Sequence, residues 1–333
     1  MRTEGVQLKP KGAFHLGVRG IGYEGTDECL HADTLFSALC AAWLLLFGEK
    51  ELRQDLLPDG EEKPPFLLSS AFPYAGSVRF YPKPLLPVPF GEQVRTKEVR
   101  WVSERVFRAW LFGEPIYDLE RIHEGRVLLT SMEAGEIAEV LGERDLRDIW
   151  LWGIGRVARV ALDALTHASE LWHFGRLLFR QGCGFWFAIR FLRDDLAEKF
   201  WAALRLMGDE GIGGDRTTGH GLFECEPMDL PDELQPQQSQ RFLTLAPLFP
   251  KRHEVSPLFN DGCAYHWLVR SGWVGGVVPT PFRRKTVRML AEGSVLWGDA
   301  TSVYGCFAEI TPDPMRPLHP VYRYGFAFPI AVR

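Results

Sequence analysis

The first fifty residues show a strand pattern followed by a helix pattern. The segment VQLKPKGAFHLG predicts an opening strand that runs into a glycine-rich stretch from Gly17 to Gly25. In HADTLFSALCAAWLLLF, apolar side chains recur at the spacing of one helix face, at Leu35, Phe36, Leu39, Trp43 and Leu46. Asp33 or Thr34 is placed to cap this helix. The chain is therefore predicted to begin with a strand, a glycine loop and an amphipathic helix.

A similar pattern returns after residue 155. RVALDALTHASELWHFGRLLF and GFWFAIRF have strand character on either side of a QGCG turn. A second helix follows Asp194 and Asp195, either of which could act as its N-cap, and its apolar face comprises Leu196, Phe200, Ala203, Leu204 and Met207. The glycine-rich segment GIGGDRTTGHG, residues 211–221, and the short strand LFECEPM come next. Strand, helix, strands, helix, strand is the order of a βαββαβ ferredoxin-like unit, which places residues 1–230 in the α+β class.

Two further regions lie outside that unit. Prolines crowd the chain from Pro58 to Pro89, and because VRFYPKPLLPVPF is too rich in proline for a central strand, we expect an edge strand or extended backbone there. Residues 90 to about 155 have weak periodicity and are interpreted as an insertion carried on the first domain. After the polar linker PDELQPQQSQ come strand-like runs and one weakly helical basic segment, RRKTVRMLAEG. They predict a second, smaller α+β domain over residues 240–333.

The composition is that of a globular protein, with 333 residues of which 46% are hydrophobic and 13% aromatic. The N-terminus has no apolar leader, and no window of about 18 uninterrupted apolar residues occurs, so we expect a cytoplasmic protein. The six cysteines lie far apart without a C-x-x-C pair, so neither a zinc site of familiar spacing nor a disulfide framework is indicated. We expect no metal and no cofactor.

Charge is distributed unevenly along the chain. The net charge of −5 argues against a protein that grips long nucleic acid by bulk attraction. From Arg79 to Arg108, however, there are seven Lys and Arg against three Glu, and from Arg241 to Leu290 eight basic against two acidic residues. A local basic surface suits a limited nucleic-acid footprint, and a solvated charged face is the alternative interpretation.

The glycine-rich segment fails both nucleotide-binding patterns. A P-loop needs a lysine and a hydroxyl residue after its last glycine, where this chain has His220 and Gly221. The dinucleotide fingerprint needs a third glycine where Arg216 stands. Both patterns also run from strand into helix, whereas this segment runs from helix into strand. It offers backbone N–H groups in nest-like conformations, with Arg216, Thr217, Thr218 and His220 as added donors, and these suit the repeated phosphates of a polynucleotide. The alternative is a turn that closes a sheet.

Other candidates for chemistry are weaker. His31 and Asp33 could be an acid/base or metal pair, but at a helix start Asp33 is more simply a cap. No G-x-S-x-G or H-E-x-x-H motif occurs, and no carboxylate cluster indicates a two-metal site. Aromatic residues alternate with arginines in the insertion, and we expect one or two of them to stack on RNA bases: Phe80, Tyr81, Trp101, Phe107 and Trp110, beside Arg79, Arg100, Arg105 and Arg108.

Six motifs in order give the chain a resemblance to a known family over essentially its whole length. They are LKPKGAFHLG, LHADTLFSALCAAW, the PKPLLP run, RVALDALTHAS, GDEGIGGDRTTGHGLFE, and the late GWVGG with RRKTVRMLAEGS. The chain resembles the RAMP-superfamily subunit of the type III-A CRISPR (Csm) effector complex that caps the 5′ end of the guide RNA.

The resemblance implies two tandem ferredoxin-like (RRM-like) domains, with a thumb-like β-hairpin insertion at about residues 80–155 of the first. It implies no nuclease activity, and as partners it implies the 5′ handle of crRNA, the large signature subunit and the repeated RAMP backbone subunit, with no membrane. The residues predicted to bind RNA are Lys9, Lys11, His31, Arg100, Arg105, Gly211, Gly213, Gly214, Arg216, Thr217, Thr218, Gly219, His220, Gly221, Arg284 and Lys285.

Two alternatives stay open. The first is a metal-independent endoribonuclease of the RAMP superfamily that processes precursor crRNA with His31 or His220 as general acid or base. The second is a protein-interaction module that touches no RNA.

Overall fold

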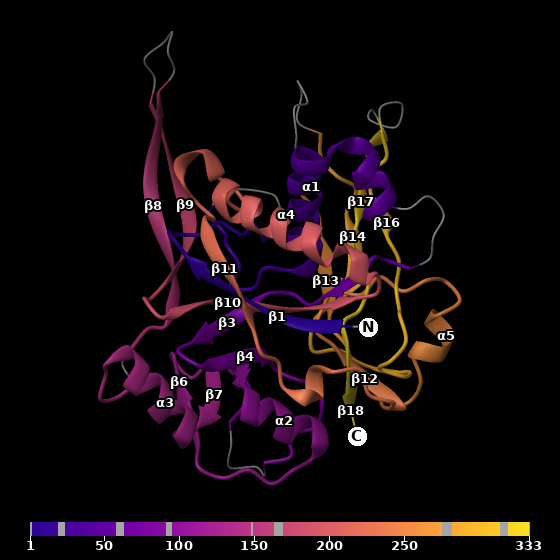
Figure 1. Ribbon diagram of the computed structural model, residues 1–333. Coiled ribbons are helices and arrows are strands. Elements are labelled where there is room, and N and C mark those ends of the chain that lie inside the picture. Colours follow the sequence, from indigo (N-terminus) through magenta and orange to yellow (C-terminus); the bar gives the residue numbers. More distant parts are fainter. Residues whose placement is uncertain are drawn as a thin grey trace.

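The computed structural model describes residues 2–18, 24–57, 63–90, 95–147, 149–162, 169–274, 282–313 and 319–332. These residues form a mixed α+β fold with one large sheet and several small sheets (Figure 1). The α+β class predicted from the sequence is therefore confirmed. The two ferredoxin-like domains stay a prediction.

The centre of the large sheet is built from the strands that the sequence predicted. Strand β1 pairs antiparallel with β10 on one side and with β11 on the other, and β10 also pairs antiparallel with β2 and β3. The strand order is thus β11-β1-β10-β3, with α1 following β1 and α4 following β10. These elements are β1 (Arg2–Pro10), α1 (Ala32–Asp55), β2 (Phe66–Leu68), β3 (Phe72–Ala75), β10 (Cys183–Phe191), α4 (Ala197–Glu210) and β11 (Phe223–Met228).

Helix α1 packs its apolar face into the main core, where Leu35, Phe36 and Trp43 are buried. It is long and apolar enough to cross a membrane by length and composition alone, but a buried face of this kind is also what a core helix has. The prediction that Asp33 or Thr34 caps it is wrong, because the helix begins at Ala32 with His31 at the N-cap position. Asp33 lies in the first turn and is buried.

Residues 78–141 extend the sheet on the β3 side. Strand β4 lies between β3 and β5, so the expectation of an edge strand is wrong for Val78–Pro82, whereas residues 83–90 belong to no helix or strand. The proline-rich run is compatible with this arrangement because Pro82 is the last residue of β4. Strand β5 then pairs parallel with β7. The extension comprises β4 (Val78–Pro82), β5 (Trp101–Ser103), α2 (Glu104–Phe112), β6 (Leu119–Ile122), β7 (Val127–Thr130) and α3 (Ser131–Leu141).

A long hairpin of β8 (Trp152–Leu162) and β9 (Ser169–Phe179) projects from the body of the molecule (Figure 1). The thumb-like hairpin was expected at about residues 80–155, and the structure places the projecting hairpin after most of that range. The two regions differ in burial. Val106 and Ile137 of the extension are buried in the main core, whereas Val160 and Leu171 of the hairpin are exposed. Residues 163–168 lie outside the described part of the chain.

The described residues of the C-terminal part of the chain form three small sheets. Strand β12 pairs with β15 and β18, β13 pairs with β14, and β16 pairs with β17. The helix expected around RRKTVRMLAEG is wrong, because Val287 to Leu290 form a strand whose last two side chains are buried. The elements are β12 (Arg241–Thr244), α5 (Val255–Leu258), β13 (Trp267–Arg270), β14 (Val287–Leu290), β15 (Val295–Trp297), β16 (Ala308–Glu309), β17 (Tyr322–Arg323) and β18 (Pro329–Val332).

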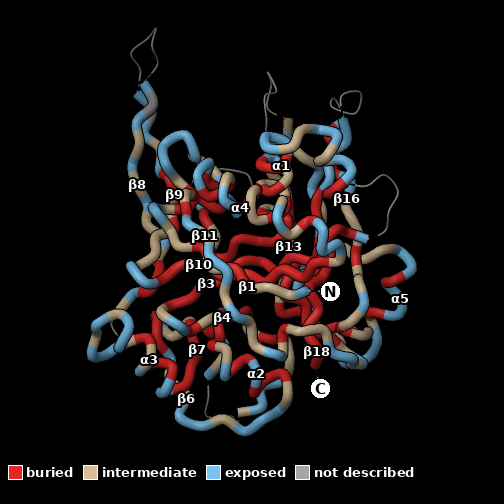
Figure 2. The backbone as a smooth tube through the Cα atoms, viewed as in Figure 1, coloured by how far each residue is buried: buried red, intermediate tan, exposed pale blue. Residues whose placement is uncertain are grey.

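The main hydrophobic core runs through both parts of the chain. Leu243, Phe328 and Ile330 of the C-terminal part belong to the same buried cluster as Val6 and Phe187 of the large sheet. Figure 2 shows this as buried backbone continuing from β1 and β10 towards β18. The residues expected to form a second domain therefore share a core with the first.

Candidate nucleic-acid interface

The glycine-rich loop, residues 211–221, connects α4 to β11, as the sequence predicted. Two of its glycines allow the loop backbone to pack closely against other backbone atoms. Gly213 and Gly221 have φ of +92° and +79°, and a Cβ on either would overlap a backbone carbonyl oxygen, that of His15 or of Ile212 respectively. The loop therefore lies directly against the segment that leaves β1.

Most of the loop's amides are already bonded inside the protein. Gly214 N–H donates to the His15 carbonyl (2.9 Å), Gly221 N–H to Ala13 (2.8 Å) and Ile212 N–H to Gly221 (3.0 Å). The expected string of free N–H groups is therefore wrong for these positions, because the loop uses them to dock on its neighbours. The exposed part of the loop is its tip, a 3-10 turn at Arg216–Thr218 followed by Gly219, where a Cβ would meet open space.

Asp215 fixes that tip to the outer half of the hairpin strand β8. Its Oδ2 lies 2.6 Å from Arg159 Nη2 of β8, and Thr218 Oγ1 donates to the same oxygen at 2.6 Å. Burial raises the pKa of the Asp215 carboxyl, but the hydrogen bonds from Arg159 and Thr218 outweigh burial and hold it below its usual value. The tip is therefore held by a charged pair as well as by backbone bonds.

Aromatic rings complete the contact between loop and hairpin. The Arg159 guanidinium lies over the rings of Phe174 (4.5 Å to the centroid) and Trp172 (5.7 Å). On the other side, the His15 ring stacks on Phe174 at 4.4 Å, and its Nδ1–H donates to the Gly175 carbonyl at 2.7 Å. The segment after β1, the glycine loop and the part of the hairpin around Arg159 and Phe174 thus form one continuous site.

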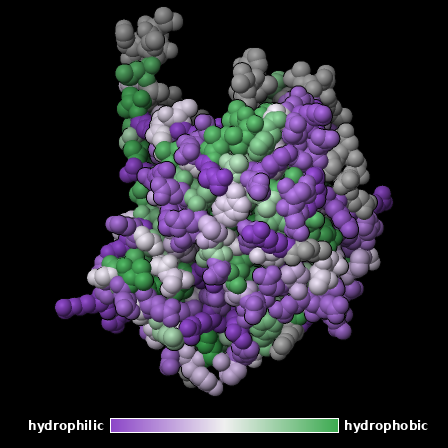
Figure 3. Space-filling model, viewed as in Figure 1, coloured by the Kyte–Doolittle hydropathy of each residue, from purple (hydrophilic) through white to green (hydrophobic). Residues whose placement is uncertain are grey.

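The sequence reasoning did not single out Arg159, Trp172 or Phe174. Arg159 and Trp172 are opposite each other in the β8–β9 register, so they lie on one face of the hairpin. The alternation of strand residues was the signal that could have paired them, but it requires the register of the hairpin to be known. Exposed apolar side chains occur along the hairpin, at Ile154, Val160, Leu162 and Leu171. Figure 3 shows apolar surface on this part of the molecule.

His220 lies beside this charged pair. Its Nδ1 is 3.0 Å from Thr218 Oγ1 and 3.4 Å from Asp215 Oδ2, and its ring meets Phe174 edge to face. Burial lowers the pKa of His220, and the nearby Asp215 only partly offsets this, so the ring is neutral at neutral pH. A neutral His220 can donate one hydrogen bond and accept one.

The predicted basic residues near the loop are exposed, but most are paired. Lys9 Nζ is 2.5 Å from Glu226 Oε2, and Lys11 Nζ is 3.5 Å from Glu224 Oε1, both on β11. For Arg216, an exposed residue, no ion pair is found within the described part of the chain. Arg216 is therefore the cation of the loop tip that is available to a phosphate.

The basic excess from Arg79 to Arg108 is largely neutralised. Arg100 Nη2 is 2.5 Å from Asp27 Oδ1, Arg105 Nη2 is 3.6 Å from Glu136 Oε1, and Arg79 Nε is 2.5 Å from Glu104 Oε2. The expectation that aromatic residues of this region reach RNA bases is wrong, because α2 and the strands turn all of them into the core: Phe80, Tyr81, Trp101, Phe107 and Trp110.

His31 lies in the interior, which corrects its expected place at the RNA. It is 7% exposed, with Nδ1 at 2.6 Å from Glu292 Oε1 and Nε2 at 3.3 Å from Asp27 Oδ2. Burial lowers the pKa of His31, but Glu292 and the other anionic neighbours outweigh it and raise the pKa well above the usual value. Residues 19–23 of the first glycine-rich stretch lie outside the described residues.

Arg284 and Lys285 belong to the C-terminal part of the chain. Lys285 Nζ is paired with Asp313 Oδ1 at 2.7 Å. Burial, with the nearby Arg323, lowers the pKa of Arg284 to about 10, and its Nε is buried without a hydrogen bond to any described residue. No contact found joins these two residues to the glycine loop within the described ranges.

The sequence and the fold both match known proteins. Residues 237–332 match the CRISPR Csm4 C-terminal domain. The CRISPR system protein Csm4 of Thermococcus onnurineus is 26% identical over 332 residues, which cover 98% of this chain and 96% of that protein. The Csm4 protein of Methanocaldococcus jannaschii is 25% identical over 348 residues, with 92% and 89% covered.

Solved structures show the same fold. A chain in the crystal structure of the Csm3-Csm4 subcomplex of a type III-A CRISPR-Cas interference complex matches with a TM-score of 0.68 at 20% identity, covering 99% of both chains. A chain in the Csm1-Csm4 cassette bound to cA4 matches with a TM-score of 0.57 at 19% identity, covering 100% and 98%. With the matched C-terminal domain and the end-to-end similarity to Csm4 proteins, the chain belongs to the Csm4 family, RAMP subunits of the type III-A CRISPR complex.

Proposed function

We propose that this chain is a non-catalytic crRNA-binding subunit of a type III-A CRISPR interference complex, that it holds the 5′ handle, and that it assembles with the large signature subunit and the repeated backbone subunit. Family membership supports the assembly, because solved Csm4 structures contain Csm3 or Csm1. The observation that carries the RNA assignment is the exposed Arg216–Thr218 tip, which Asp215 and Arg159 hold against the side of the projecting hairpin.

The tip offers the chemistry that a polynucleotide backbone needs. Arg216 can bind a phosphate through two N–H groups, and Thr217 adds a hydroxyl donor. Lys9 and Lys11 lie on the same side, at the end of β1, since Lys11 N–H bonds to the carbonyl of Leu222 just after the loop. Phosphate contacts of this kind position an RNA without reading its bases.

The hairpin beside the tip offers surfaces for bases. Trp172 is half-buried, and Val160, Leu162 and Leu171, farther out on the hairpin, are exposed and apolar. Unpaired bases stack on aromatic rings with about 1–3 kcal/mol per base. We propose that β8 and β9, rather than residues 80–155, are the thumb-like insertion.

The same proposal extends to the domains. We propose that residues 1–230 contain a ferredoxin-like domain, and the strand order β11-β1-β10-β3, with α1 after β1 and α4 after β10, supports this. We propose that residues 240–333 form the second, smaller one, and that the protein works in the cytoplasm.

The structure does not favour the endoribonuclease alternative. A general acid or base must come within hydrogen-bond reach of its substrate. His31 is buried between Asp27 and Glu292, so of the two candidate histidines only His220 lies near the exposed tip. Incubating the purified chain with precursor repeat RNA in EDTA tests this, and site-specific cleavage that His220→Ala abolishes would establish the enzyme.

The binding proposal is tested in the assembled complex. Complexes carrying Arg216→Ala with Thr217→Ala are expected to retain several-fold less crRNA at raised salt than wild type. The control is Arg53→Ala, which removes an exposed arginine on α1 that is paired with Glu49. Unchanged crRNA retention would refute the loop assignment. If ultraviolet crosslinking of the wild-type complex also yields no RNA-linked peptide from this chain, the protein is an interaction module that touches no RNA.

A further inference from the structure

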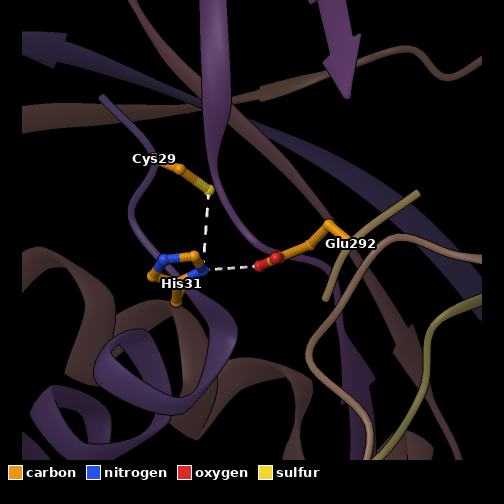
Figure 4. Close-up of side chains that lie close together, drawn as sticks. All are labelled: Cys29, His31 and Glu292. Atoms are coloured by element: carbon orange, nitrogen blue, oxygen red, sulfur yellow. Dashed lines mark hydrogen bonds and ion pairs between the residues drawn. The ribbon is translucent and has the colours of Figure 1, made fainter. Parts of the chain in front are cut away.

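Three potential metal ligands meet where the start of α1 faces the C-terminal part of the chain. Cys29 and His31 come from the segment just before α1, and Glu292 follows β14 (Figure 4). His31 Nδ1 lies 2.6 Å from Glu292 Oε1 and 3.9 Å from Cys29 Sγ. All three ligand atoms lie within 4.8 Å of one another, and no other such group of three is found within the described residues.

The cluster is enclosed by protein. Cys29 is 4% exposed, and the side chains of His31 and Glu292 are 8% and 7% exposed. A thiol, an imidazole and a carboxylate are the three side-chain types that bind Zn²⁺ in proteins. The thiol is the informative member, because the ion pairs of His31 with Asp27 and Glu292 do not involve it, whereas a thiolate is a preferred ligand of Zn²⁺.

A second layer of side chains holds two of these ligands in place. Asp27 Oδ2 lies 3.3 Å from His31 Nε2, the ring nitrogen that faces away from the cluster. Ser70 Oγ–H donates to Glu292 Oε1. A carboxylate on the far nitrogen of a ligating histidine and a hydrogen bond to a ligating carboxylate are the usual supports of a protein zinc site.

We propose that Cys29 Sγ, His31 Nδ1 and Glu292 bind a divalent transition-metal ion, with Zn²⁺ as the natural occupant. The ion takes the place of the proton between His31 Nδ1 and Glu292 and of the Cys29 thiol proton, so that it binds the sulfur as thiolate and both protons are released to solvent. A water molecule or the second Glu292 oxygen is left to supply a fourth ligand. From the sequence no metal is expected, since the chain lacks a zinc site with familiar spacing, and the site proposed here escapes that pattern because Glu292 lies 261 residues beyond His31.

The ion would serve the structure. It ties the segment before α1 to the turn after β14, so metal binding stabilises the contact between the two parts of the chain. The site is separate from the glycine-loop tip. A loss of RNA binding therefore leaves metal binding unchanged, and a loss of metal binding does not by itself test the RNA proposal.

The test uses the full chain and Co²⁺ as a visible probe for Zn²⁺. Wild type purified from zinc-supplemented culture is expected to retain about one zinc per chain after dialysis, measured by plasma mass spectrometry. Co²⁺ titration of the metal-free protein is expected to produce a sulfur-to-cobalt charge-transfer band. Cys29→Ser is expected to abolish this band and Cys40→Ser, which removes a cysteine outside the cluster, to leave it unchanged. Asp27→Asn is expected to weaken binding about 10- to 100-fold.

Two results would overturn the proposal. The first is a wild-type protein that retains no zinc and gives no charge-transfer band, which needs no variant. The second is a band that survives Cys29→Ser. If Cys29→Ser does not fold by circular dichroism, Glu292→Gln takes its place, with loss of stoichiometric zinc as the expected result and unchanged zinc as the contrary one.

Discussion

Arg270 binds the Asp33 carboxylate with two hydrogen bonds, from Nε at 2.9 Å and from Nη2 at 3.0 Å, although the two residues are 237 positions apart. Arg323 of β17 binds the same carboxylate, and all three side chains are buried. One carboxylate in the first turn of α1 thus holds two arginines of the C-terminal part. It was expected to cap the helix, and instead it joins the two parts of the chain.

Replacing Asp33 by Asn is expected to lower the free energy of unfolding by about 3–5 kcal/mol, because it leaves two buried guanidinium groups without their anion. Chemical denaturation measures this. Glu49→Gln is the control, since Glu49 pairs with Arg53 on the exposed face of α1 and the expected change is about 0.5 kcal/mol or less. Similar losses for the two variants would show that the buried pair has no special role.

The glycine loop gives a second prediction, on stability. Gly221→Ala is expected to cost about 3 kcal/mol or more, because the new Cβ combines a positive φ with overlap of the Ile212 backbone. Gly219→Ala is the matched control: its φ is +86°, but a Cβ there meets open space, so about 1 kcal/mol is expected. Thermal unfolding of both variants checks the order, and an equal loss would mean that the loop does not pack as described.

The large sheet could be predicted because its signals are local. The short apolar, aromatic-rich run in GFWFAIRF and the helical spacing from Leu196 to Met207 each specify an element without knowledge of its partners. The glycine loop was placed between helix and strand for the same reason. Its use was predicted less well: glycines mark close backbone approach, and the sequence does not say whether a phosphate or the protein's own carbonyl makes that approach.

Long-range pairs explain what the sequence could not show. Asp33 looked like a cap because its arginines, Arg270 and Arg323, lie far along the chain. A count of charges likewise made residues 79–108 appear basic, but Asp27 and Glu136 neutralise Arg100 and Arg105 in the fold. Burial of β14 overrode the weak helical pattern around Arg288.

His123 gives a pH-dependent prediction. It is buried against the Trp152 ring, with centroids 4.6 Å apart, and burial lowers its pKa below the usual value, with Glu28 only partly offsetting this. Below about pH 6.5 the unfolded chain therefore binds a proton more readily than the folded chain, so His123 destabilises the fold as pH falls, and contributes nothing to the pH dependence well above that pH.

The measurement compares the free energy of unfolding of wild type and His123→Asn between about pH 5 and pH 7.5. Asparagine is chosen because His123 has φ of +55°, which Asn tolerates. The loss of stability with falling pH is expected to be smaller in the variant, and parallel curves would exclude a perturbed His123.

The salt dependence of RNA binding separates free from paired arginines. Arg216→Ala is expected to reduce the slope of log K against log salt concentration by about 0.7, the value for one phosphate contact on a single strand, when the complex is titrated with handle RNA. Arg100→Ala removes an equal charge, but its guanidinium already lies 2.5 Å from Asp27 Oδ1 and next to Glu28, so a smaller change in slope is expected. The difference arises because only an arginine that displaces counterions from RNA contributes to the slope. An equal change of slope in the two variants would mean that the ion pairs in the structure do not determine which arginines bind RNA. The assignment of the loop tip as the phosphate site would then be wrong.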